Sequence, residues 1–391
     1  MTKAVRVGLV GARFAASFHW EGLRRVYGVP VDIVGVTSKT AEARDTFARE
    51  KGILAFENLN ELCAAVDVVD ICTPPSSHES IAIQALQLGK HVILEKPLTG
   101  YYGSEVDGFS GRTFSKETML REAAASCARI LEAARDSGKK VCYAENWVYA
   151  PAIQKEREIV AKSGGQILWM LGEQSHSGSH SPYYGSWKFS GGGSMVGKGC
   201  HPLSAALYLK RVEGEARYGA ALRPTSVSAR THEITRLAGY RDEGFLRTSY
   251  DDVEDYAQMH VRFSDGTVAD IFSSELVVGG VHNWLEVVCN NHRTRCNLNP
   301  VDALETFNPR EEILRDVYVT EKIGTKQGWS HPAPDEAWQH GYPQEFQDFM
   351  ESIYHDREPL SGIELARDTI ATIYAGYLSA ERSGAEVEIP C

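Results

Sequence analysis

Two side chains combine a reactive group with a local sequence that would hold that group in place. Lys96 follows the apolar run HVILE (91–95) and precedes Pro97, so the chain turns sharply and fixes the lysine at a strand end. An ammonium held there can stabilise negative charge that develops on an oxygen atom. His201 follows the glycine-rich stretch 191–199, and an imidazole titrates in the range needed to exchange protons near neutral pH. Together they predict chemistry on a hydroxyl or carbonyl group.

A glycine-containing loop follows the first strand-like run, 5–10, at the place typical of a dinucleotide site. Gly11 fits the tight turn and Ala16 the close helix contact, but Arg13 stands where a glycine usually lets the backbone reach the pyrophosphate. A helix that begins here still offers free N–H groups to a phosphate. The predicted cofactor contacts in this loop are Gly11, Arg13, Phe14 and Ala15.

Ser38 and Lys39 follow the second strand-like run, 31–36, at the position that contacts the adenosine ribose. An acid there would bond the 2′-hydroxyl and repel a 2′-phosphate, whereas Ser and Lys accept the phosphate. The sequence therefore predicts NAD(P) as cofactor and favours NADP. If Lys39 is only a solvated loop charge, NAD is left open.

The elements that must position these residues alternate between short β-branched runs and amphipathic stretches. The apolar runs lie at 5–10, 31–36, 67–73, 91–95 and 140–145, and the helical stretches between them at 15–26, 40–52 and 76–90. Apolar runs this continuous are typical of strands buried on both faces of a parallel sheet. Residues 1–145 are therefore predicted to form an α/β domain with a Rossmann-type doubly wound sheet.

The pattern changes after Pro151 to longer alternating runs. The run 256–276 indicates two antiparallel strands that turn at Asp265-Gly266, and helices are predicted at about 343–355 and 363–383. Residues 146–391 are thus predicted to form a C-terminal α+β domain with an open, mostly antiparallel sheet, for substrate binding and oligomerisation.

Two segments stand outside this pattern. Residues 99–117 are rich in glycine and aromatics and show neither the alternation of a strand nor the period of a helix. This predicts an ordered, functional loop inserted in the first domain. The acidic run of Asp251, Asp252, Glu254 and Asp255 is interpreted as a solvated face at the start of a strand.

Three motifs carry a family resemblance: TPPSSH at 73–78, EKPL at 95–98 and GGGSMVGKGCHPL at 191–203. They resemble motifs of the Gfo/Idh/MocA oxidoreductases, a family that includes inositol and sugar dehydrogenases. The resemblance covers nearly the whole chain. It implies that Lys96 hydrogen-bonds the reacting oxygen near the nicotinamide and that His201 is the catalytic base. Further cofactor contacts are predicted at Thr73, Pro74, His78, Glu95 and Lys96.

The chain departs from the family motif at Gly197, where the family usually has Asp four residues before the histidine. That carboxylate would share a helical face with His201 and contact substrate. Its loss removes one acceptor for substrate hydroxyl groups, and Lys198 is a candidate replacement.

Polar and aromatic residues gather in the segment 173–188, and a polyhydroxyl ligand needs both kinds. The predicted substrate contacts are Glu145, Asn146, His176, His180, Trp187 and Lys198. His176 and His180 are four apart, but no acid or cysteine joins them at ligand spacing, so no metal is predicted. The alternative to substrate contacts is that the segment 173–188 is a solvated loop.

The predicted function is that of an NAD(P)-dependent dehydrogenase or reductase acting on a CH–OH group of a sugar, cyclic polyol or glycoside. The alternatives are redox-neutral, NAD-assisted glycoside cleavage and a non-catalytic nucleotide-binding sensor. A net charge of −11 argues against nucleic acid, and no run reaches the ~20 apolar residues of a membrane span. We expect a cytoplasmic protein with reduced, buried cysteines. The resemblance to the family implies a homodimer or homotetramer.

Overall fold

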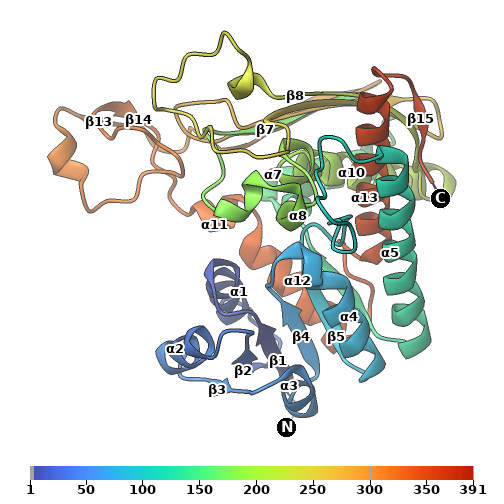
Figure 1. Cartoon of the computed structure of the whole chain (residues 1–391), viewed down its shortest axis with the longest axis vertical. Coiled ribbons are helices and arrows are strands. Elements are labelled where there is room, and N and C mark those ends of the chain that lie inside the picture. The colour runs from blue at the N-terminus through green and yellow to red at the C-terminus, as the bar shows by residue number, and fades with distance from the viewer. Residues whose placement is uncertain (1–3, 300–301, 391) are drawn as a thin grey trace.

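The N-terminal part is built on a six-stranded parallel sheet. The computed structural model describes residues 4–299 and 302–390 (Figure 1). The sheet order is β3-β2-β1-β4-β5-β6, and every neighbouring pair is parallel. Its strands are β1 (Val5–Val10), β2 (Val31–Thr37), β3 (Leu54–Ala55), β4 (Val68–Ile71), β5 (His91–Glu95) and β6 (Val141–Ala144). The predicted Rossmann-type sheet is confirmed, and its strand order reverses beside β1, where such sheets bind ligands.

Helices flank this sheet because its strands are apolar on both faces, and β4 is buried along its whole length. The helices are α1 (Phe14–Arg24), α2 (Ala41–Lys51), α3 (Leu59–Ala65), α4 (His78–Gln87) and α5 (Lys116–Ser137). The short elements β3 and α3 were not predicted. Their two and seven residues are too few to show the alternation of a strand or the 3.6-residue period of a helix.

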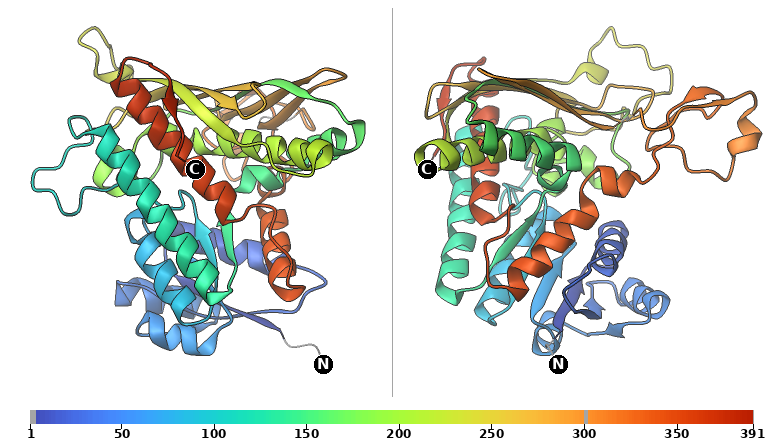
Figure 2. Two further views of the ribbon diagram at one scale, coloured as in Figure 1. Left: turned by 90° about the vertical axis from the view of Figure 1, so that its right-hand side faces the viewer. Right: turned by 180° about the vertical axis from the view of Figure 1, so that it is seen from behind.

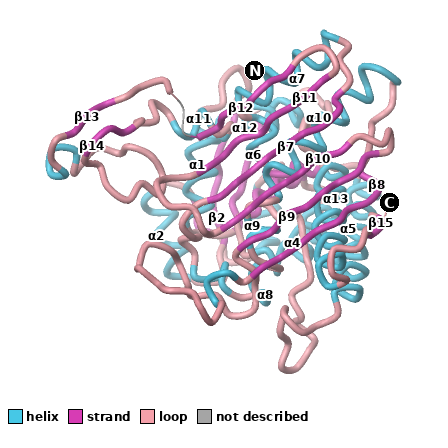
Figure 3. Tube along the Cα trace, turned by 90° about the horizontal axis from the view of Figure 1, so that it is seen from above, coloured by secondary structure: helices cyan, strands magenta, loops and turns pink. Residues whose placement is uncertain are grey.

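A second, seven-stranded sheet forms the other layer of the molecule (Figure 3). Its order is β12-β11-β7-β10-β9-β8-β15, and all neighbours are antiparallel except β7 and β10. Its strands are β7 (Ile167–Ser175), β8 (Pro224–His232), β9 (Tyr256–Phe263), β10 (Val268–Ser274), β11 (His282–Cys289), β12 (Arg293–Asn299) and β15 (Val387–Glu388). The predicted, mostly antiparallel sheet is confirmed. Its β9–β10 hairpin turns at Gly266, whose φ of 84° favours glycine.

Helices of the second half cover one face of this sheet and also reach the first. They are α6 (Asn146–Tyr149), α7 (Pro151–Ser163), α8 (Trp187–Ser190), α9 (Ser194–Gly197), α10 (Cys200–Tyr218), α11 (Glu336–Gln339), α12 (Tyr342–Tyr354) and α13 (Ile363–Glu381). Helix α12 packs beside α1, and α13 contacts both α5 and β8, so the two late helices join the layers (Figure 2). Short 3₁₀ turns lie at Pro75–Ser77, Pro182–Gly185, Ile234–Arg236 and Glu311–Leu314.

A lobe projects from the body between β12 and α11 (Figure 1). It carries the two-stranded ribbon of β13 (Thr306–Asn308) and β14 (Gly328–Ser330). Large apolar side chains on the lobe are exposed, including Phe307, Tyr318 and Trp329.

The loop between β5 and α5 is held against the second half of the chain. The Trp187 indole donates to the Tyr101 carbonyl at 3.0 Å, and the Gly111 N–H donates to Asp252 at 2.5 Å. Arg112 forms an ion pair with Glu233 at 2.7 Å. The loop is therefore ordered by contacts that cross between the two layers.

The interpretation of the acidic run as a solvated face is wrong for Glu254 and Asp255, which are buried, whereas Asp251 is exposed. The Asp255 carboxylate accepts the N–H groups of Ile234 and Thr235 at 2.7 and 2.8 Å. Glu254 accepts from Gly193 and Met195, at 3.1 and 2.8 Å. Charged residues in this run therefore serve as internal caps, which a one-dimensional pattern does not distinguish from a solvated face.

Two further expectations concern the whole chain. The described cysteines are free and buried, as expected, and Cys391 lies outside the described residues. Within residues 4–299 and 302–390, no helix is both long and apolar enough to cross a membrane.

Candidate active site

Lys96 lies where the two layers meet, at the carboxyl end of β5. A cis peptide bond joins it to Pro97. Its Nζ donates to the Gly197 carbonyl at 3.2 Å and lies 5.6 Å from the ring centre of Tyr184. Burial alone would lower the pKa of this ammonium, but the acidic groups around it, with Tyr184 and Cys200 the largest contributors, raise it. The lysine is therefore a fixed positive charge. Its bond to Gly197 brings the motifs at 95–98 and 191–203 into contact.

His201 lies in the first turn of α10 and is oriented by an acid. Its Nδ1 is 2.6 Å from Oε1 of Glu145, which follows β6, and the two side chains are 7% and 0% exposed. The Trp147 ring lies nearly parallel to the imidazole, with 6.2 Å between ring centres. Burial lowers the pKa of His201, but the neighbouring Cys200 and Glu145 outweigh it and raise the pKa to about 9.

The arrangement gives the imidazole a defined orientation. Because Glu145 occupies Nδ1, Nε2 is the nitrogen left to exchange a proton with a ligand. The other Glu145 oxygen, Oε2, is buried and has no hydrogen-bond partner among the described residues. A base oriented by a carboxylate and a nearby fixed cation suit proton transfer from a hydroxyl group whose oxygen becomes negative.

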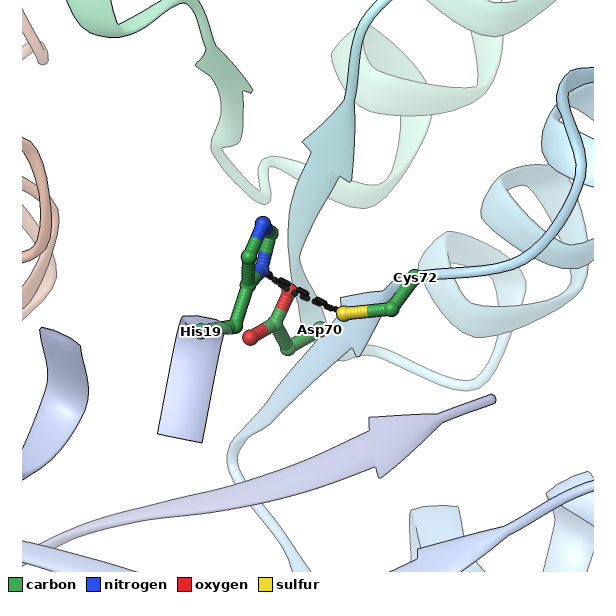
Figure 4. Close-up of side chains that lie close together, drawn as sticks. All are labelled: His19, Asp70 and Cys72. Carbon is green, nitrogen blue, oxygen red and sulfur yellow. Dashed lines mark hydrogen bonds and ion pairs between the residues drawn. The ribbon is translucent and has the colours of Figure 1, made fainter. Parts of the chain in front are cut away.

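A buried chain of polar and charged groups leads to the turn that carries Lys96. His19 of α1 lies 2.8 Å from Asp70 and 3.3 Å from the Cys72 sulfur through Nδ1 (Figure 4). Its Nε2 lies 3.2 Å from Glu95. The other Glu95 oxygen accepts the Lys96 N–H at 2.8 Å.

The charges in this chain sustain one another. Burial opposes the charge on His19, but Asp70 and then Cys72 outweigh it and raise the pKa of His19 well above its usual value. Burial would raise the pKa of Glu95, but the hydrogen bond from His19 lowers it. A protonated His19 thus holds Glu95 ionised under the turn that carries Lys96. Sequence reasoning missed His19 and Asp70, although an acid inside the buried strand VVDI was an available signal.

The position of Gly197 adjoins Tyr184. A Cβ built on Gly197 would meet two ring carbons of Tyr184 at 3.5 Å. The tyrosine therefore lies beside both Gly197 and Lys96, in a segment that was predicted to be polar and aromatic without Tyr184 being singled out. Lys198, the candidate replacement, is buried and bound internally: its Nζ contacts Glu275 and lies 3.2 Å from the Ser179 hydroxyl.

The remaining predicted substrate contacts differ in burial and in their hydrogen-bond partners. His176 is partly buried near Lys198, and burial first and Lys198 second lower its pKa. The His180 side chain is 75% exposed, 3.8 Å from Glu321. Asn146 is buried and donates to the His340 carbonyl at 2.8 Å. Trp187 is buried between the 99–115 loop and Tyr377, so its ring faces the loop.

The turn after β1 fits a dinucleotide pyrophosphate. Gly11 has φ of 111°, and a Cβ there would lie 2.8 Å from the Cys72 carbonyl oxygen, so only glycine fits. No side chain caps the start of α1, which leaves its first N–H groups free for a phosphate. Arg13 and Phe14 are exposed at this helix start, and Ala15 is partly exposed.

The other predicted cofactor residues lie along the same sheet edge. Ser38 and Lys39 follow β2; Ser38 is partly exposed and Lys39 is exposed. Thr73 and Pro74 follow β4. His78 is fully buried, with its two ring nitrogens 2.9 Å from the Pro97 carbonyl and 3.0 Å from the Thr73 carbonyl. His78 therefore ties the two motif turns together.

Family models match both halves of the chain. The model described as "Oxidoreductase family, NAD-binding Rossmann fold" matches residues 5–104, and the GFO/IDH/MocA C-terminal domain model matches residues 153–294. The protein belongs to the Gfo/Idh/MocA family of oxidoreductases, and its N-terminal domain is of the NAD-binding type.

Individual relatives and solved structures resemble the chain to different extents. The chain is 26% identical over 363 residues to levoglucosan dehydrogenase of Pseudarthrobacter phenanthrenivorans, covering 85% of this chain and 83% of that one. It is 32% identical over 116 residues to UDP-N-acetylglucosamine 3-dehydrogenase of Acidithiobacillus ferrooxidans, 30% of this chain and only 36% of that relative. Among solved structures, GenD2 from gentamicin A biosynthesis in complex with NAD has a TM-score of 0.79 at 23% identity, covering 100% and 98% of the chains.

Proposed function

We propose that the protein transfers hydride between NAD(P) and a carbinol or carbonyl carbon of a sugar, cyclic polyol or glycoside. The observation that carries this proposal is the meeting of Lys96 with the segment that bears His201: the Lys96 Nζ bonds the Gly197 carbonyl, and His201 is oriented by Glu145. The family membership and the relatives that act on sugars support the substrate class.

The side chains have separate tasks in this proposal. Lys96 donates to the reacting oxygen and stabilises the negative charge that develops on it. His201 takes the hydroxyl proton at Nε2 during oxidation and returns it during reduction. Glu145 holds the ring in position and stabilises the imidazolium. The bound nicotinamide supplies the hydride acceptor or donor.

We further propose that NADP is the preferred dinucleotide. Support comes from the end of β2, where Ser38 and exposed Lys39 stand in place of an acid. Fluorescence titration with NADPH and NADH tests this preference. NADPH should bind more tightly, and Lys39→Asp should reverse the order. Equal affinity of the two in the wild type would refute it.

We also infer that the protein is a homodimer or homotetramer. The exposed apolar side chains of the lobe, such as Trp329 at 73% exposure, support an interface between copies. Light scattering coupled to size exclusion gives the mass directly. A monomer at all concentrations would refute the inference.

The function is tested with purified protein, each oxidised dinucleotide and a panel of sugars, polyols and glycosides. Formation of reduced nicotinamide in step with substrate oxidation is expected, and Lys96→Ala and His201→Ala should each reduce it by about 10²-fold or more. Lys162→Ala is the matched control, since that lysine is exposed on α7. Cleavage of a glycoside without net dinucleotide reduction would instead support the redox-neutral alternative.

A further inference from the structure

Lys322 is a partly buried cation near the candidate active site, and among the described residues it forms no ion pair with a carboxylate. It lies in the segment that leads from the lobe back to α11, and its backbone φ of 60° is in the left-handed region. Its Nζ donates to the Gly178 carbonyl, and no carboxylate oxygen of the described residues lies within 4.0 Å of that nitrogen. Such conformations are uncommon for non-glycine residues, although Asp356 and Ser383 adopt them in turns elsewhere in the chain.

Other cations surround the same loop. The guanidinium of Arg247 donates to the Ser179 carbonyl at 2.8 Å, and Lys198 lies 3.2 Å from the Ser179 hydroxyl. Burial is the largest contributor that lowers the pKa of Lys322. The neighbouring Glu321 opposes it, and the like charge of Lys198 acts in the same direction as burial. The whole chain has a net charge of −11, so this concentration of positive charge is local.

The nearby acids compensate for this charge incompletely. Glu275 is already bound to Lys198, and it also accepts the Ser179 N–H at 2.8 Å. Burial and then Glu336 raise the pKa of Glu321, while Lys322 opposes them. Among the described residues, neither of these two acids has a carboxylate oxygen within 4.0 Å of the Lys322 Nζ.

Donor groups with spare capacity face this region. An ammonium has three N–H donors, and one contact is recorded for Lys322 and one for Lys96, each with a backbone carbonyl. The Nδ1 of His176 accepts the Gly178 N–H at 3.1 Å, so its proton is on Nε2, which is a donor. Like Lys322, Lys96 has no carboxylate oxygen of the described residues within 4.0 Å.

We propose that Lys322, Lys198 and His176, next to Lys96, form a subsite for an anionic substituent of the substrate, a carboxylate or phosphate ester on the sugar. Charge-assisted bonds to such a group would offset the cost of the unpaired, partly buried Lys322. This inference rests on the proposed function, because the subsite lies beside the reacting position assigned there.

The test compares substrates that differ only in the anion: glucose, glucuronate and glucose 6-phosphate. With the wild type, at least one anionic sugar should exceed glucose in kcat/KM by about tenfold or more, mainly through KM. Glucuronate and glucose 6-phosphate separate the carboxylate source from the phosphate source. Lys322→Met should remove most of the preference, and Lys322→Arg should retain it. Lys188→Met, an exposed lysine, is the matched control.

Two further measurements keep the test decisive. Calorimetric titration of the dinucleotide-loaded protein with the same sugars compares their affinities without turnover. If Lys322→Met does not fold, the salt dependence of KM in the wild type replaces it, because KM for the anionic sugar should rise with salt and that for glucose should not. Equal use of glucose and both anionic sugars would overturn the subsite and leave the proposed function intact. Absence of turnover with every substrate would count against the function instead.

Discussion

Replacing Glu145 with glutamine should move the pH dependence of oxidation toward lower pH. His201 must be neutral to accept a proton, and its pKa of about 9 means that kcat/KM in the wild type rises with pH up to about 9. Part of that pKa comes from the Glu145 carboxylate, which stabilises the imidazolium through Nδ1. Glutamine keeps an acceptor oxygen for the Nδ1 proton but removes the charge.

The size of the shift follows from the geometry. Glu145 Oε1 lies 2.6 Å from Nδ1, and neither side chain is more than 7% exposed. An opposite charge this close favours the charged form by about 1–3 pKa units, and burial, which remains in the variant, favours the neutral imidazole. We expect the rising limb of the profile of kcat/KM against pH to move to lower pH by about 2 units. This shift corresponds to about 3 kcal/mol of lost stabilisation of the His201 imidazolium.

The assay is kcat/KM for oxidation of the best substrate across the pH range, with an NMR titration of the His201 ring protons as an independent reading. Cys200→Ala is the companion variant, because Cys200 is the other neighbour that raises the pKa of His201 and its removal leaves the Glu145 bond intact. Its limb should also move to lower pH. A limb at the same or higher pH in Glu145→Gln would refute the assigned role of Glu145.

Three further changes test other parts of the molecule. His19→Gln should lower the free energy of unfolding by about 3–5 kcal/mol, because it leaves buried acids unpaired, and it should also reduce kcat. A loss of stability with unchanged kcat would show that His19 does not position Lys96. Gly11→Ala should weaken dinucleotide binding measured by calorimetry about tenfold or more, since its Cβ would lie 2.8 Å from the Cys72 carbonyl oxygen; unchanged affinity would contradict the assigned turn. Burial raises the pKa of Glu254 to about 7, so the folded state holds this proton more tightly than the unfolded state, and its contribution to stability should fall as pH rises from about 4.5 to 7. Denaturant unfolding of Glu254→Gln should therefore lose less stability over that range, by about 3 kcal/mol, and parallel curves for the two proteins would contradict this.

Much of the fold was predictable because local signals agreed with the tertiary arrangement. The continuous apolar runs of β1, β4 and β5 are buried on both faces, so their sequence reflects the parallel sheet directly. The β9–β10 hairpin also followed from alternation and a glycine turn. Glu254, in the acidic run at 251–255, was misinterpreted because its partners, the N–H groups of Gly193 and Met195, are distant in sequence.

The sequence by itself predicted the class of chemistry, because a lysine before a proline at a strand end, a histidine after a glycine-rich turn and a glycine turn at a helix start are local features. Only the tertiary structure decided their partners. It placed Glu145 on His201, a buried His19 behind Lys96, Tyr184 beside Gly197 and Lys322 near Lys198. Most of these contacts join segments far apart in the chain, and charge and hydrogen bonding depend on distance in space, which spacing in sequence does not encode.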